Sequence, residues 1–166
     1  MLKKYVLTLI DYNYWANGLI LKYADRLKQD EYFNKTAYSH KSIHEILVHI
    51  LFAEWVWRER MMGNSPNLAT VSTHLRPQDF DSLDKVVEKW FNEEMKMREF
   101  IDKISEEKLF ETLTYTTTQG DEMEDVYIDI ITHVVFHGMQ HRAEAAAILH
   151  NFDQSPGDID FIRYLR

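Results

Sequence analysis

The sequence of 166 residues contains no cysteine. This absence excludes disulfide bonds, cysteine nucleophiles, iron–sulfur clusters and thiolate zinc sites. Any metal ion would have to be bound by histidine, aspartate, glutamate or water. Proline and glycine are also rare, with three and five residues, so long uninterrupted helices can form.

Basic clusters and long apolar runs are missing as well. The net charge is −8 and no stripe of Lys and Arg is present, which disfavours a nucleic-acid partner. No segment reaches the roughly 20 apolar residues that a membrane span requires. The apolar N-terminal run is interrupted by Asp11 and Asn13 and no small-residue cleavage site follows it, so we interpret it as a helix rather than a signal peptide. We therefore expect a cytoplasmic protein with no membrane partner.

The composition indicates a folded helical chain. Apolar residues make up 45 % and aromatic residues 13 %, enough for a sizeable core in one domain covering residues 1–166. Helical periodicity is found over residues 3–27, 42–62, 82–104 and 123–150. Residues 109–121 are rich in Thr and end on Gly-Asp, which suggests a short β-hairpin or an extended loop before the last long helix. The sequence therefore predicts an all-α fold, a four-helix bundle, whose topology stays open because the connection between the second and third helices is long.

A capping box marks the start of the second helix. The Ser42 hydroxyl can accept the amide of Glu45 while the Glu45 carboxylate reaches back to the amide of Ser42. His44 and His49 do not form the H-E-x-x-H zinc motif, because they are five residues apart and point to different sides of the helix. Glu45 shares a face with His49 and could accept a hydrogen bond from it, although capping is the simpler explanation.

A ladder of histidines lies in the last long helix. His133, His137 and His141 are four residues apart, so each step turns only about 40° around the helix. Neutral imidazoles on one face suit a divalent metal, which takes nitrogens at about 2.0–2.1 Å. The turn reaches about 80° from the first rung to the third, so we predict His137 and His141 as ligands and His133 as a supporting or polar core residue.

His49, in the middle of the apolar second helix, is the predicted third ligand, provided that the two helices pack together. A di-iron carboxylate site is excluded, because it needs Glu-x-x-His pairs and no Glu in the chain is followed three residues later by His. Asn13 and Asn17 are polar at helical spacing in the apolar first helix, where they either belong to the core or face a cavity.

These motifs occur in an order that resembles the DinB/YfiT-like family. The matching residues are Tyr12-Asn13-x-Trp15-Ala16-Asn17, Ser42-Ile43-x-x-Ile46-Leu47-x-His49, His137-x-x-x-His141-Arg142 and Pro156-Gly157-Asp158-Ile159-Asp160. The resemblance implies a four-helix bundle that holds a metal, often nickel or zinc, through His49, His137 and His141. It also implies chemistry with a low-molecular-weight thiol, such as bacillithiol, mycothiol or glutathione, and a homodimer. One departure is Ala143-Glu144, where the family often has Gly-Gln after the His-Arg pair.

The expected function is that of a metal-dependent enzyme, either a thiol-dependent S-transferase or a hydrolase, acting on a small-molecule substrate. Three imidazoles leave a divalent ion with open positions, where it lowers the pKa of bound water or thiol. Zinc or nickel is the expected cofactor, with iron or manganese as alternatives, and the sequence identifies no further catalytic residue. Two alternatives remain: a non-catalytic, stress-associated metal-binding bundle, which a fourth protein ligand would favour, and an interaction module without metal.

Overall fold

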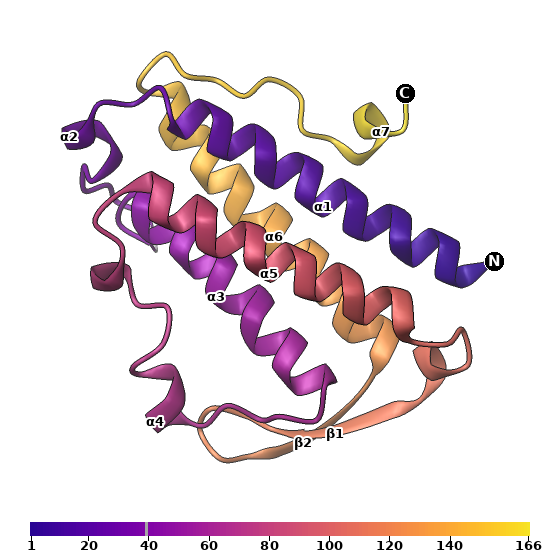
Figure 1. Cartoon of the computed structure of the whole chain (residues 1–166). Coiled ribbons are helices and arrows are strands. Elements are labelled where there is room, and N and C mark those ends of the chain that lie inside the picture. Colours follow the sequence, from indigo (N-terminus) through magenta and orange to yellow (C-terminus); the bar gives the residue numbers. More distant parts are fainter. Residues whose placement is uncertain (39) are drawn as a thin grey trace.

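The computed structural model describes residues 1–38 and 40–166. Four long helices dominate this part of the chain (Figure 1): α1 (Leu2–Ala24), α3 (Ile43–Met61), α5 (Leu83–Lys103) and α6 (Tyr127–His150). Short helices and turns join or follow them: α2 (Gln29–Tyr32), α4 (Leu68–Val71), η1 (Pro77–Asp79), η2 (Lys108–Phe110) and α7 (Phe161–Tyr164). The predicted all-α four-helix bundle is confirmed.

The predicted hairpin is also present before the last long helix. Strands β1 (Thr112–Thr116) and β2 (Glu122–Val126) pair antiparallel, with Thr112 opposite Val126. Gly120 turns the chain between them with a φ of 99°, a conformation that suits glycine. Because β2 pairs with β1 through residue 126, α6 begins at Tyr127 rather than at the predicted residue 123.

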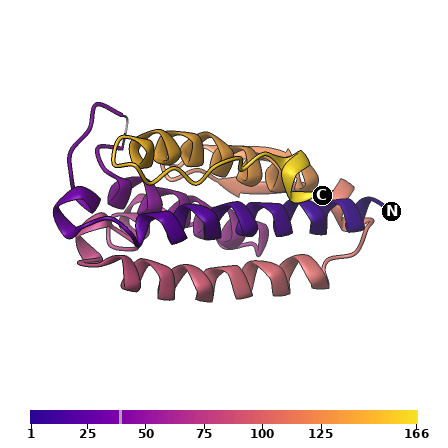
Figure 2. The ribbon, with the colours of Figure 1, turned by 90° about the horizontal axis from the view of Figure 1, so that it is seen from above.

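The four long helices form a closed ring of contacts. Helix α1 packs on α6, α6 on α3, α3 on α5 and α5 on α1, and Figure 2 shows α5 and α6 on opposite sides of α1. In Figure 1, α1 and α6 run in one direction while α3 and α5 run in the other. Since α3 and α5 are parallel neighbours, the connection of residues 62–82 must return along the length of the bundle. This return places α4 and η1 beside α3.

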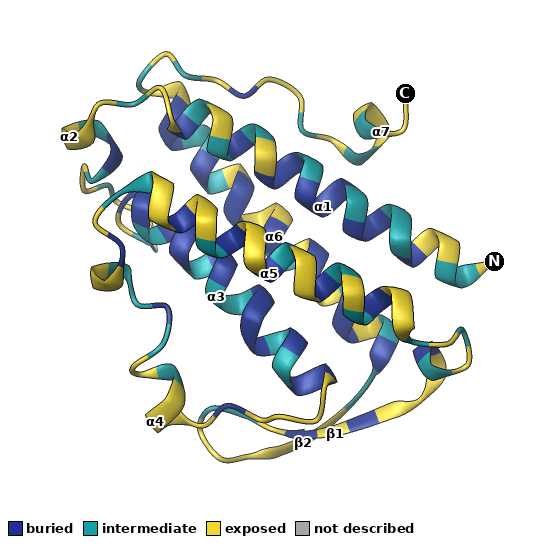
Figure 3. Ribbon diagram, viewed as in Figure 1, coloured by how far each residue is buried: buried dark blue, intermediate teal, exposed yellow. Residues whose placement is uncertain are grey.

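The buried residues follow the helical periodicity of the sequence (Figure 3). On α5 the buried positions are Val86, Trp90, Glu93, Met97 and Ile101, three or four residues apart, as expected for a helix with one face in the core. On α3 and α6 the burial extends around more of each helix. Helix α3 also packs against η1 and, through Trp57, against Tyr115 of β1, while α6 also packs against η2 and β2. Within the described residues, the structure contains no helix that is long and apolar enough to cross a membrane.

The C-terminal segment packs back against α1. The Tyr12 hydroxyl donates a hydrogen bond to the carbonyl of Ile159 at 3.0 Å, and the Tyr12 ring lies 5.2 Å from that of Phe161. The aromatic residues of the first helix therefore serve in part to hold the end of the chain.

Candidate metal centre

The structure brings together the three histidines that the sequence predicts as ligands. His49 on α3 faces His137 and His141 on α6, and the Nε2 atoms of His49 and His137 are 3.1 Å apart. The ring of His141 lies 4.6 Å from the rings of both His49 and His137, measured between centroids. His141 is buried, whereas His49 and His137 are half-buried. The packing of α3 on α6 thus makes the three imidazoles converge from two helices, as expected.

A fourth histidine, His40, joins this group and was missed from the sequence. Its ring stacks on that of His49, with centroids 3.8 Å apart and planes inclined by 23°, and lies 5.1 Å from the ring of His141. The ligand nitrogens of His40, His49 and His141 all lie within 4.8 Å of one another. We refer to His40, His49, His137 and His141 as the histidine cluster. Because His40 is in a connection, it has no periodicity to reveal it. The only sequence signal was its place just before the helix cap at Ser42.

His133 lies at the edge of the cluster. Its side chain is exposed, and its ring is 5.8 Å from that of His137. The nearer aromatic neighbour is Trp57, at 5.1 Å. That His133 is not one of the ligands stays a prediction.

Glu144 contacts the cluster directly. The Nδ1 atom of His141 donates a hydrogen bond to the Glu144 carboxylate at 3.0 Å. A proton held on Nδ1 leaves Nε2 with its lone pair, which is the arrangement that carboxylates impose on metal-binding histidines. The glutamate that departs from the family pattern therefore contacts one of the predicted ligands directly.

Three histidines of the cluster, His40, His49 and His137, are held in their neutral form. Burial, together with the neighbouring imidazoles, lowers the pKa of His49 to about 3 and that of His137 to about 4. Burial also lowers the pKa of His40, with His141 contributing. Since a metal binds the neutral imidazole, these three side chains need not lose a proton near pH 7 to become ligands.

The separation of His49 and His137 fits two ligands of one metal ion. Two nitrogens that each lie about 2.0–2.1 Å from one ion are roughly 2.9–3.4 Å apart in four- to six-coordinate sites, and the Nε2 atoms of His49 and His137 have this separation. A hydrogen bond between two neutral imidazoles would explain the same distance. However, it would account for only this pair and leave the convergence of His40 and His141 unexplained.

A cleft of about 240 Å³ adjoins the cluster. His40 and His49 line both the cleft and the cluster, and the other cleft residues come mainly from α3 and the connection that holds α4 and η1. They are Val48, Phe52, Val71, His74, Leu75, Arg76 and Pro77. The cleft is thus largely apolar and reaches the candidate metal site on one side.

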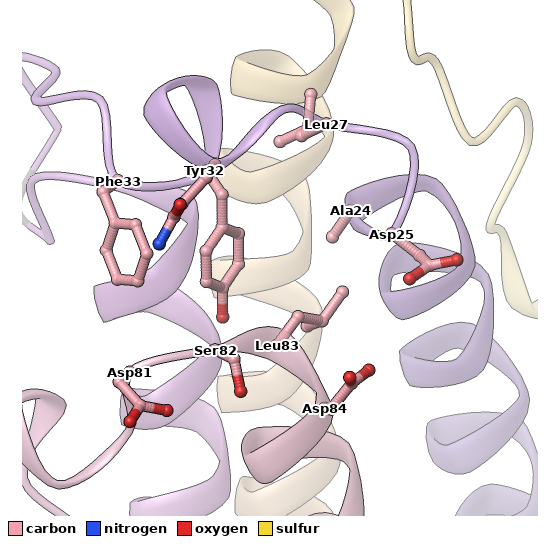
Figure 4. Close-up of a pocket in the computed structure, with 10 residues that line it drawn as sticks. Ala24, Asp25, Leu27, Tyr32, Phe33, Asp81, Ser82, Leu83 and Asp84 are labelled. Atoms are coloured by element: carbon pink, nitrogen blue, oxygen red, sulfur yellow. The ribbon is translucent and has the colours of Figure 1, made fainter.

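A second depression lies at the C-terminal end of α1, where Ala24 and Asp25 line it (Figure 4). Among the described residues its lining contains no histidine. It combines apolar and polar side chains: Ala24, Leu27, Tyr32, Phe33 and Leu83 with Asp25, Gln29, Asp81, Ser82 and Asp84. It is therefore separate from the cluster.

The two asparagines of the first helix lie in the core, which is one of the two expectations for them. Asn13 and Asn17 donate to the Glu54 carboxylate at 2.8 and 2.9 Å and accept from Arg142 at 2.6 and 2.8 Å. Trp90 donates to the other oxygen of Glu54 at 2.9 Å. The two carboxamides thus bridge a buried cation and a buried carboxylate, and they fix α6 against α1 and α3 beside His141.

Fold and site together define a four-helix bundle with a histidine cluster between two neighbouring helices. The DinB family matches residues 1–166, so the chain belongs to the DinB family. It is also 23 % identical over 159 residues to Protein DinB of Bacillus subtilis (strain 168), a match that covers 95 % of this chain and 91 % of that protein. The resemblance seen in the sequence is confirmed. Family membership and the cluster both fit a metal-binding role.

Proposed function

We propose that the protein is a metal-dependent enzyme in which His49, His137 and His141 hold a divalent ion. Zinc or nickel is the first choice for this ion, with iron or manganese as alternatives. The observation that carries this proposal is the convergence of these imidazoles, with 3.1 Å between the Nε2 atoms of His49 and His137. Glu144 supports it by fixing the tautomer of His141.

When bound, such an ion lowers the pKa of a thiol or a water molecule and so supplies a nucleophile near neutral pH. The chain has no cysteine, so an attacking thiol has to come from a cosubstrate. We propose a low-molecular-weight thiol in a transferase reaction, with water in a hydrolase reaction as the competing choice.

The cleft beside the cluster is the proposed substrate site. Val48, Phe52, Val71 and Leu75 offer apolar contacts, which favour a small substrate with an apolar body. His49 lies in the wall of this cleft, so a group bound there would be presented to the metal site.

The test uses protein without a histidine tag, stripped of metal and reconstituted separately with zinc and with nickel. Bacillithiol, glutathione or no thiol is supplied with an electrophilic aryl halide to detect transfer, and with an aryl ester to detect hydrolysis. We expect turnover that depends on added metal, that falls by at least about 100-fold in His49→Ala, and that persists in the exposed control His133→Ala. Full metal loading with no turnover in any arm would contradict the enzyme proposal and favour a non-catalytic metal-binding bundle.

A further inference from the structure

We propose that His40 is an exchangeable fourth ligand of the metal site. It closes the site while the cleft is empty, and it leaves when the donor atom of a small ligand takes its place. This inference rests on the proposed function, since it requires an ion held by His49, His137 and His141.

The first observation is proximity. The ligand nitrogens of His40, His49 and His141 lie within 4.8 Å of one another. The His40 ring stacks face to face on the His49 ring, with centroids 3.8 Å apart, so the two imidazoles are in direct contact. A small movement of either ring would therefore bring the nitrogens of both to one ion.

The second observation is how differently the cluster histidines are held. His49, His137 and His141 belong to long helices, and His141 is further fixed by Glu144. His40 is half-buried in the connection before α3, and within residues 1–38 and 40–166 its ring has no hydrogen-bond partner. It is thus the cluster member whose ring can leave without disturbing a helix.

The connection that carries His40 is nevertheless anchored close to the cluster. The Glu45 carboxylate accepts a hydrogen bond from the amide of Lys41 at 3.1 Å and pairs with the ammonium group of Lys35. The connection is therefore tied to the first turn of α3 through the side chain of Lys35 and the amide of Lys41. This contact corrects one half of the predicted capping box: the Glu45 carboxylate accepts a hydrogen bond from the amide of Lys41 and not from that of Ser42. The amide of Glu45 does bond to the Ser42 hydroxyl at 3.2 Å.

The third observation is the position of His40 between the cluster and the cleft. His40 belongs to both, so removing its ring from the metal site would open that site toward the cleft. Four neutral imidazoles leave the charge of a divalent ion uncompensated. An anionic donor such as a thiolate, whose proton passes to the buffer, is therefore favoured over His40 by charge.

The test reconstitutes the full chain with Co²⁺, whose visible absorption reports the number of ligands. Wild type is compared with His40→Ala and with His74→Ala. His74 is a matched control, because it lines the same cleft but its ring packs against that of Trp55, with centroids 4.1 Å apart and planes tilted by 38°. Azide and 2-mercaptoethanol serve as the displacing probes, and circular dichroism of the metal-free proteins verifies folding.

We expect His40→Ala to weaken Co²⁺ affinity by about 10-fold and to alter the cobalt spectrum. Because the competing ligand is gone, the same variant should bind azide about 10-fold more tightly. In wild type, each probe should shift the cobalt spectrum toward that of His40→Ala with the same probe bound. His74→Ala should behave like wild type.

Three results would overturn the inference. An unchanged spectrum and affinity in His40→Ala would show that His40 is not a ligand, while leaving the proposed metal site intact. A wild-type spectrum that neither probe can shift, with His40→Ala altered, would make His40 a permanent ligand of a closed site. Failure of the folded wild type to bind Co²⁺ would overturn the proposed function itself, and the inference with it.

Discussion

Nδ1 of His141 donates a hydrogen bond to Oε2 of Glu144, 3.0 Å away and one helical turn further along α6. The carboxylate thereby orients the ring and makes Nε2 a better donor to a metal. In the sequence Glu144 is a departure from the family pattern, whereas the structure shows it bonded to a predicted ligand. We infer from this contact that Glu144 supports the metal site.

Replacement of Glu144 tests this role. We expect Glu144→Ala to lower metal affinity by about 10- to 100-fold, the usual effect of losing a carboxylate behind a metal-binding histidine, with a smaller loss in Glu144→Gln. Chelator competition measures the affinity. The control is Glu88→Gln, which neutralises an exposed glutamate on α5. Equal affinities in all four proteins would refute the role.

Gly138 is required by the packing of Arg142. A Cβ atom added at Gly138 would lie 2.6 Å from Nη1 of Arg142 and 2.8 Å from Oδ1 of Asn13. The guanidinium would have to move away from its partners, so we expect Gly138→Ala to lower the free energy of unfolding by about 1–3 kcal/mol in urea titrations.

A matched control for this change lies on α1. Gly18 is exposed, and an added Cβ there would meet nothing within 4 Å. Gly18→Ala should therefore stabilise the protein by about 0.5–1 kcal/mol through helix propensity. If the two alanine variants had the same stability, the packing argument would fail.

Glu54 gives the stability a specific dependence on pH. Burial raises its pKa from 4.5 to about 7, against the opposing effect of hydrogen bonds from Asn13, Trp90 and Asn17. Between these two pH values the folded state binds more protons than the unfolded state. The stabilisation that Glu54 contributes to the folded state is therefore complete below pH 4.5, and it is lost as the pH rises through about 7.

From pH 6 to pH 8 this loss should amount to about 1–1.5 kcal/mol in wild type. Glu54→Gln retains the shape but cannot titrate, so its free energy of unfolding should lack this component, whatever its absolute stability. Urea titrations of both proteins at the two pH values provide the measurement. Parallel pH profiles would mean that Glu54 does not change its protonation state in this range.

The sequence was sufficient for the helices and for most of the cluster, because periodicity reveals both. The apolar spacing of α5 and the four-residue steps from His137 to His141 are local signals. The start of α6 was placed too early, since Met123 and Val126 fit a helical pattern and only their pairing with β1 makes them a strand.

The remaining features depend on contacts between distant parts of the chain. His40 reaches the cluster only because the connection folds back onto α3, through the bonds of Glu45 to Lys35 and Lys41. The bridge from Arg142 to Glu54 joins three helices through Asn13 and Asn17. A polar residue in an apolar helix indicates that such a partner exists but does not identify it.

The most direct test of the metal site is elemental analysis by mass spectrometry. Wild type, His49→Ala and His133→Ala, all without a histidine tag, are reconstituted with zinc or nickel and freed of excess ion. We predict about one bound ion per chain in wild type and in His133→Ala, and almost none in His49→Ala. No stoichiometric ion in folded wild type, or full occupancy in His49→Ala, would contradict the account.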